Sequence, residues 1–86
     1  MANPKTYLVS YDLVAPGRDY KPLVEAIQSL GGVRVLQSQW VIRVSNTAAQ
    51  VRDYLRTFMD GNDRILVNDF LDWASWNALV KLDQAA

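Results

Sequence analysis

Hydrophobic positions along the chain change period several times, and each change marks the boundary of a predicted element. Residues 7–13, with the sequence YLVSYDL, are largely β-branched and aromatic and precede the turn signal Ala15-Pro16-Gly17, so they predict a strand. One face of this strand is wholly apolar, and the other begins with Leu8. Apolar residues on both faces are typical of a central strand.

Two amphipathic helices are predicted from apolar residues that recur every three or four positions. Residues 20–30 have this spacing, with Asp19 as the expected N-cap and Gly31-Gly32 as the expected stop. Thr47 and Gln50 have the spacing of a capping box and open the second helix. Its predicted buried stripe consists of Ala48, Val51, Leu55, Phe58 and Met59.

Three further strands complete the pattern. Residues 33–37 and 40–45 predict a hairpin, and residues 64–70 predict the last strand. The order strand, helix, strand, strand, helix, strand indicates an α+β, ferredoxin-like βαββαβ domain, with a four-stranded antiparallel sheet and both helices on one face. We expect one domain over residues 1–86, with its core in residues 6–70 and an extra C-terminal segment over residues 71–86.

This architecture leaves one sheet face without helices, although some of its side chains must be apolar. Homodimerisation is the simplest way to cover such a face. In the C-terminal segment, Trp73, Trp76, Leu79 and Val80 lie at helical spacing and are too apolar to be left in solvent. We therefore expect the segment to pack on its own subunit or on a partner.

Composition narrows the chemistry. Cysteine and histidine are both absent, which excludes disulfides, thiol nucleophiles, the usual zinc sites and the Ser-His-Asp triad. Nine basic and nine acidic residues give a net charge of zero, less basic than nonspecific nucleic-acid binding favours. No apolar segment approaches the ~20 residues of a membrane span, so we expect a cytoplasmic protein without a membrane partner.

Asp12 is the main candidate for chemistry, because it lies where the first strand delivers a side chain to its end. Magnesium is commonly held by one or two carboxylates together with waters and phosphate oxygens. One aspartate per subunit is too few for a tight site, but two copies across a dimer axis would suffice. The alternative is that Asp12 accepts backbone N–H groups of the following loop.

Ser38 and several arginines are secondary candidates. Ser38, at the hairpin turn, could orient a water or bond a phosphate, although ordinary turn chemistry explains it as well. Arg34 and Arg43 on the hairpin strands could contact phosphates. Arg52 and Arg56 are better explained as solvated charge on the second helix. The segment 60–63 has ordinary turn composition, although Asn62-Asp63 could form a second carboxylate site.

Several of these residues form a pattern that resembles the small CRISPR-associated Cas-two proteins. The pattern consists of Tyr11-Asp12-Leu13, Arg18, the hairpin from Arg34 to Trp40, and Asn62-Asp63-Arg64. The likeness is closest to uncharacterised bacterial relatives of the SinR family, through the run S-Y-D-L-x-x-P-G-R-D-Y, here Ser10 to Tyr20. It covers residues 7–76.

The resemblance implies a ferredoxin-like homodimer in which the two copies of Asp12 face one another and bind Mg²⁺ or Mn²⁺. Some members of the family are metal-dependent nucleases, some are DNA-binding scaffolds, and relatives include toxin ribonucleases of the VapD type. Carried over by position, Arg18, Arg34 and Ser38 lie near phosphate, and Trp40 is the family's aromatic residue. The chain departs from the family at Leu36, where glutamine is usual. The basic run that follows the first strand in the family is also reduced here to Arg18.

Two functions are therefore open. The first is a Cas-two-like homodimer that binds nucleic acid, or cleaves it as a metal-dependent endoribonuclease or deoxyribonuclease, in a CRISPR or toxin–antitoxin system. The second is a noncatalytic interaction module, such as an antitoxin or assembly adaptor. It would hold a protein partner through the Trp73 and Trp76 segment or through a sheet edge.

Overall fold

The computed structural model describes residues 3–15, 17 and 19–79. Its elements follow one another as β1 (Lys5–Asp12), α1 (Lys21–Ser29), β2 (Val33–Leu36), β3 (Gln39–Val44), α2 (Ala48–Arg56) and β4 (Arg64–Asp69). Each predicted helix and strand of the core is present, with ends that differ by one or two residues, except that α2 ends at Arg56, three residues before Met59, the last residue of its predicted stripe. The hairpin turn is formed by Gln37 and Ser38, one residue earlier than the spacing suggested.

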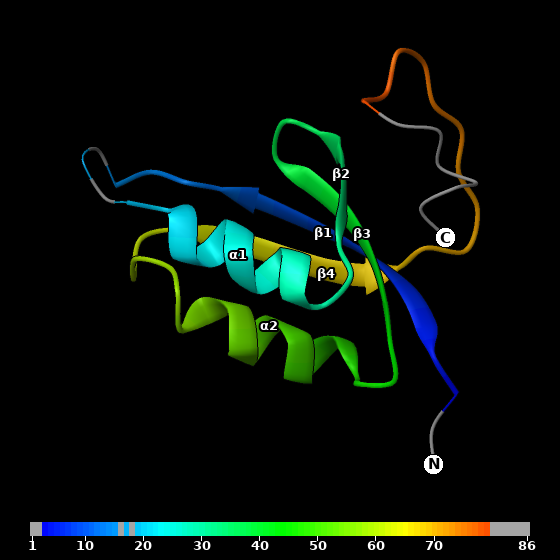
Figure 1. The fold of residues 1–86 in the computed structure, drawn as a ribbon, viewed down its shortest axis with the longest axis horizontal. Coiled ribbons are helices and arrows are strands. Elements are labelled where there is room, and N and C mark those ends of the chain that lie inside the picture. Colours follow the sequence, from blue (N-terminus) through cyan, green and yellow to red (C-terminus); the bar gives the residue numbers. More distant parts are fainter. Residues whose placement is uncertain (1–2, 16, 18, 80–86) are drawn as a thin grey trace.

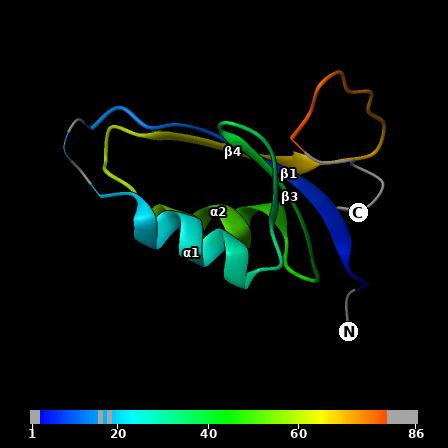
Figure 2. The ribbon, with the colours of Figure 1, turned by 45° about the horizontal axis from the view of Figure 1, so that its top comes forward.

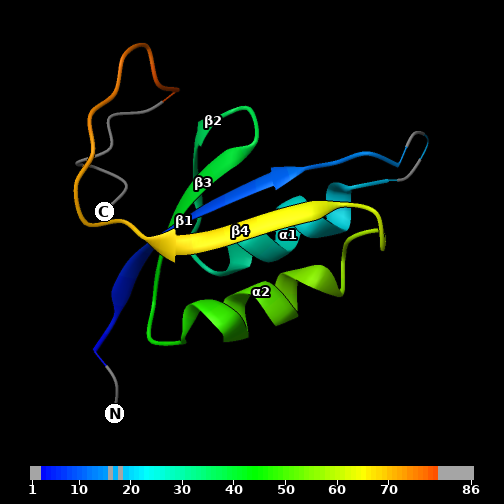
Figure 3. The same ribbon diagram turned by 180° about the vertical axis from the view of Figure 1, so that it is seen from behind.

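The four strands form one antiparallel sheet in the order β2-β3-β1-β4. Figure 1 shows α1 and α2 side by side on one face of this sheet, and Figure 2 shows the sheet and the helices as two layers. The architecture is a small α+β fold consistent with the predicted ferredoxin-like arrangement. β1 pairs on both sides, as its two apolar faces predicted, whereas β4 lies at one edge of the sheet (Figure 3).

The main core lies between the sheet and the helices. It joins Tyr7, Val9 and Tyr11 of β1 to Trp40 and Ile42 of β3 and to the buried stripes of both helices. Within the core, the Trp40 indole N–H donates to the Tyr11 hydroxyl at 2.9 Å, so both polar atoms are satisfied. The predicted stripe of α2, from Ala48 to Met59, packs in this core as expected.

The helix ends confirm part of the predicted capping. Thr47 and Gln50 form a reciprocal capping box at α2. At α1 the prediction of an Asp19 cap was wrong by one position, because Tyr20 is the N-cap and Asp19 accepts from the Lys21 N–H at 2.9 Å. Gly31 ends α1 with a φ of +79°, a conformation that favours glycine.

The segment after β4 contains no helix over residues 71–79, despite the helical spacing of its apolar residues. It lies on the sheet face opposite the helices (Figure 2), where Phe70 packs with Leu8 on the small buried pair Val35 and Val41. The Leu79 N–H donates to the Val35 carbonyl at 2.9 Å. The described part of the segment therefore contacts its own chain at these two points.

Much of this second face stays open. Leu66 on β4 is 61% exposed and Leu36 on β2 is 44% exposed. Among the described helices, none has the length and apolar character needed to cross a membrane.

Candidate functional site

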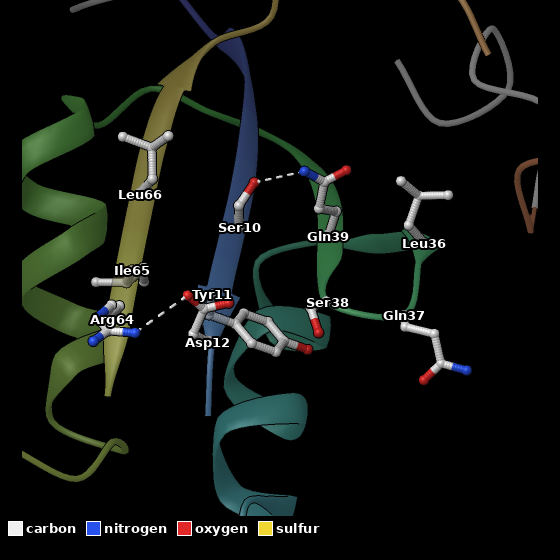
Figure 4. A pocket seen from close by; sticks show the side chains of 10 residues that line it. All are labelled: Ser10, Tyr11, Asp12, Leu36, Gln37, Ser38, Gln39, Arg64, Ile65 and Leu66. Atoms are coloured by element: carbon white, nitrogen blue, oxygen red, sulfur yellow. Dashed lines mark hydrogen bonds and ion pairs between the residues drawn. The ribbon is translucent and has the colours of Figure 1, made fainter. Parts of the chain in front are cut away.

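A cavity of about 460 Å³ lies where β1 ends, β4 begins and the β2–β3 hairpin turns. Figure 4 shows its lining, which includes Asp12, Arg64 and Leu66 on one side and the hairpin residues Leu36, Ser38 and Gln39 on the other. It therefore brings together the two residues that the sequence singled out for catalysis, Asp12 and Ser38. Strand ends meet here because β1 runs antiparallel to both of its neighbours.

Asp12 faces a cation on the neighbouring strand. It pairs in register with Arg64, and its carboxylate lies 3.8 Å from the guanidinium across the sheet. The two side chains are 69% and 75% exposed, so both remain solvated. The pair leaves an anionic and a cationic group available on one open surface.

The alternative explanation of Asp12, a loop-capping role, can be compared with the described part of the following loop, residues 13–15 and 17. Within the described residues, no backbone N–H of the following loop donates to its carboxylate. The Val14 N–H instead donates to Asp63, at 2.7 Å.

The hairpin turn is fixed to β1 beside Asp12. The Tyr11 N–H donates to the Ser38 carbonyl at 3.1 Å, and the Gln39 amide donates to the Ser10 hydroxyl at 3.1 Å. The backbone bond to Tyr11 places exposed Ser38 next to the end of β1. Ser38 can offer a hydroxyl to a ligand there, but in the described residues no base lies within hydrogen-bond distance to activate it.

Two of the predicted arginines, Arg34 and Arg43, lie away from this cavity. Arg34 lies 4.7 Å above the Trp40 ring, on the helix side of the sheet. Arg43 reaches the Thr6 hydroxyl at 3.4 Å, near the opposite end of β1. Arg18 falls outside the described residues. The cation that does line the cavity is Arg64, which the motif Asn62-Asp63-Arg64 contained but which was not chosen as a site residue.

A divalent metal is poorly matched by one chain. The described residues contain no group of three or more carboxylate, histidine or cysteine side chains that could hold an ion. Asp12 is also already paired with Arg64, whose charge opposes a second cation. One copy of this site does not fit a magnesium or manganese ion.

A second aspartate, Asp63, accepts hydrogen bonds from the loops beside the cavity. The Asp63 carboxylate accepts from the Val14 N–H, from the Tyr20 hydroxyl at 2.6 and 2.7 Å, and from the Asp60 N–H at 2.8 Å. Partial burial, followed by the hydrogen bond to Asp63, raises the pKa of Tyr20 above its ordinary value. Asp63 thus joins the loop after Asp12 to the loop before β4, beyond the turn role that its composition suggested.

Comparison with known proteins adds no family to this geometry. No model of a protein family matches the chain, and no solved structure is significantly similar to it. The resemblance to Cas-two proteins stays a prediction. What the site can do must therefore follow from its own side chains.

Those side chains offer several hydrogen-bond donors around one cavity. Arg64 offers a guanidinium, Ser38 a hydroxyl and Gln39 an amide around a cavity open to solvent. These are the groups that contact nucleic-acid phosphates and sugars. Asp12 adds a carboxylate beside Arg64, which a phosphate entering the cavity would also meet.

Proposed function

We propose that this protein is a ferredoxin-like, Cas-two-like homodimer that binds nucleic acid at the Asp12–Arg64 cavity. The observation that carries the proposal is the convergence of Asp12, Ser38 and Arg64 on one open cavity at the end of the central strand. Arg64 is the phosphate contact, because its planar guanidinium accommodates two phosphate oxygens at once. Ser38 bonds a neighbouring phosphate or sugar oxygen.

Asp12 takes a metal role only in the dimer. One chain supplies one carboxylate to the cavity, whereas two copies of Asp12 across a dimer axis would offer the two carboxylates that Mg²⁺ or Mn²⁺ commonly uses. The exposed apolar residues Leu36 and Leu66 on the same sheet face support dimerisation there. One chain on its own supports binding and not metal-assisted hydrolysis.

The test compares two exposed arginines in a fluorescence anisotropy titration with labelled single-stranded RNA, single-stranded DNA and a DNA duplex. Arg64→Gln is expected to weaken binding about fivefold or more for every sequence and to reduce the salt dependence by about one phosphate contact. Arg52→Gln is the matched control, because Arg52 lies on α2 and pairs with its neighbour Asp53 at 3.0 Å. Equal affinities of the Arg64 variant and the wild type would refute the assigned role.

A cleavage assay with the same oligonucleotides tests the enzymatic form of the proposal. Turnover that requires Mg²⁺ or Mn²⁺ and disappears in Asp12→Ala would support a metal-dependent nuclease. Cleavage that persists in Asp12→Ala would exclude Asp12 as the metal ligand. Binding of the oligonucleotides without cleavage would indicate a nucleic-acid-binding scaffold and not a nuclease.

A noncatalytic interaction module is the second candidate function. It is favoured by the segment that follows β4, where Trp76 is 87% exposed and Leu71 88% exposed. Large apolar side chains left in solvent commonly mark a surface that another protein covers. This function does not require Asp12, so the two candidates are separable by mutation.

A further inference from the structure

A second cavity, of about 410 Å³, lies between the segment after β4 and the helix-free face of the sheet. Its floor is Leu8 on β1 and Val35 on β2, and its wall is the segment from Asp72 to Ala78, drawn in orange in Figure 1. The volume is within the range of small-ligand pockets, about 300–1,000 Å³. The cavity is separate from the Asp12 site, although Leu36 and Gln39 line both.

The wall is held in place by contacts at both ends. Phe70 packs on the buried pair Val35 and Val41, and the Trp73 ring lies against Phe70 with centroids 5.8 Å apart. At the other end, the Leu79 N–H donates to the Val35 carbonyl at 2.9 Å. The segment therefore arches over the sheet with its ends anchored, and the cavity lies beneath the arch.

The lining combines aromatic rings with negative charge. Trp73 is 43% exposed and Trp76 is 87% exposed, so each offers ring surface to a ligand. Among the described residues of the lining, the charged ones are Asp69 and Asp72, and Asp69 pairs in register with the core residue Tyr7, on the helix side of β4. Within the described part of the chain, neither carboxylate takes part in an ion pair.

We propose that this cavity binds an arginine side chain presented by a segment of a protein partner. A guanidinium stacks on the face of a tryptophan ring through a cation–π interaction and pairs with carboxylates through its planar fork. The apolar floor at Leu8 and Val35 takes the methylene stem of the same side chain. The proposal rests on the second candidate function, for which it specifies the chemistry of the partner.

The charge of the lining argues against the other occupants. A nucleic acid could stack its bases on the two tryptophans. It would then bring its phosphates towards Asp72, with no lysine or arginine among the described residues of the lining to receive them. A cationic side chain instead neutralises the Asp72 carboxylate. Charge complementarity thus selects a basic protein segment over an oligonucleotide.

The experiment follows the tryptophan indole N–H signals of the full-length protein by NMR during titration with two synthetic hexapeptides. One peptide is Ac-Gly-Leu-Arg-Leu-Gly-Ser-NH₂, and the other carries neutral citrulline in place of arginine. The signals of Trp73 and Trp76 are expected to shift with the arginine peptide. Trp40 serves as an internal reference, because its indole N–H is bonded to Tyr11 in the core.

Two exposed aspartates provide the matched variants. Asp72→Asn is expected to lower the affinity for the arginine peptide about fivefold, whereas Asp53→Asn on α2 should leave that affinity unchanged. Citrulline should bind at least about fivefold more weakly than arginine, because it keeps the shape but loses the charge. Exposed positions are chosen so that the variants keep the wild-type fold, which the Trp40 signal reports.

Each alternative result overturns a defined part of the inference. Equal shifts with both peptides would reject recognition of the cation while leaving an apolar protein-binding module in place. No shift at Trp73 or Trp76 with either peptide would reject the cavity as a peptide site. Shifts that appear with protein concentration alone, accompanied by a dimer mass in light scattering, would assign the cavity to a second copy. Shifts produced by an oligonucleotide and not by the peptide would assign it to nucleic acid.

Discussion

Asp12 and Arg64 face each other across the β1–β4 pair at 3.8 Å, and both side chains are mostly in solvent. Exposed ion pairs contribute about 0–1 kcal/mol to stability, because water screens them and both side chains lose rotamer freedom. The pair therefore sets the charge at the cavity and contributes little to the fold.

Asp12→Asn and Arg64→Gln should accordingly each change the free energy of unfolding by less than about 1 kcal/mol. Urea denaturation followed by far-ultraviolet circular dichroism measures this change. The result matters for function, because a loss of nucleic-acid binding in a fully stable variant reports on the site itself. A destabilisation of several kcal/mol would show that the pair supports the fold.

The bond between Trp40 and Tyr11 should behave in the opposite way. Both side chains are nearly fully buried, and the indole N–H donates to the Tyr11 hydroxyl at 2.9 Å. Trp40→Phe removes the donor and leaves a cavity, so we expect a loss of about 2–4 kcal/mol. Tyr11→Phe, which leaves the indole N–H unpaired, should cost about 1–3 kcal/mol.

A double-mutant cycle isolates the bond from the change in volume. We expect a coupling energy of about 1 kcal/mol between the two substitutions in urea unfolding. Strictly additive losses would mean that the bond contributes nothing beyond packing. Arg34, stacked on Trp40, should have a smaller ring to stack on in the Trp40 variant but an unchanged one in the Tyr11 variant.

Local signals in the sequence located most elements, and features that depend on register were harder to find. The Thr47 and Gln50 capping box and the stop at Gly31 involve residues a few positions apart, so their spacing alone revealed them. Arg64 was missed because its relation to Asp12 exists only once β1 and β4 pair in a given register. The available clue was that an antiparallel pairing places the end of β1 beside the start of β4, and therefore Asp12 beside Arg64.

The segment after β4 shows a different limit. Trp73, Trp76 and Leu79 have helical spacing, yet the described residues follow an irregular path in which Asn77 has a φ of +54°. This path is held by the contact of Trp73 with nearby Phe70 and by the bond from Leu79 to the Val35 carbonyl, which is distant in sequence. Tertiary packing here overrides a local periodicity, as it often does.

The Tyr20–Asp63 bond should make stability depend on alkaline pH. Partial burial, and then the hydrogen bond to Asp63, raise the pKa of Tyr20 in the folded protein. A raised folded-state pKa means that the contribution of Tyr20 is complete below about pH 10, its unfolded value, and is lost as the pH rises through the raised value. Tyr20→Phe should therefore be less stable than the wild type at neutral pH, and the difference should shrink in strong alkali.

Ultraviolet titration of tyrosinate absorbance checks the pKa directly. Tyr20→Phe should remove a component that titrates above the ordinary tyrosine range, and Asp63→Asn should shift that component to lower pH because it removes the negative charge and the strong acceptor. Tyr54→Phe, on the exposed side of α2, is the control that should leave the component in place. An unchanged titration in Asp63→Asn would contradict the assigned role of Asp63.

The proposed dimer should govern metal binding as well as assembly. Leu66 is 61% exposed on the edge strand β4 and lies on the helix-free face with the Asp12 cavity. Leu66→Lys would bury a charge in a dimer interface there, which costs far more than leaving it in water. We expect this variant to be monomeric in light scattering, whereas Tyr54→Lys on the helix side keeps the mass of the wild type.

Manganese binding, followed by water-proton relaxation, then separates assembly from ligation. If two copies of Asp12 form the site, the wild-type dimer binds Mn²⁺, and Leu66→Lys loses the ion although its own Asp12 is intact. Asp12→Asn loses the ion although it remains a dimer. Equal Mn²⁺ binding by a monomeric Leu66 variant would contradict a shared site, because the described residues of one chain offer no cluster of three ligands. A wild-type dimer that binds no Mn²⁺ would leave the Arg64 phosphate contact as the chemistry of this cavity.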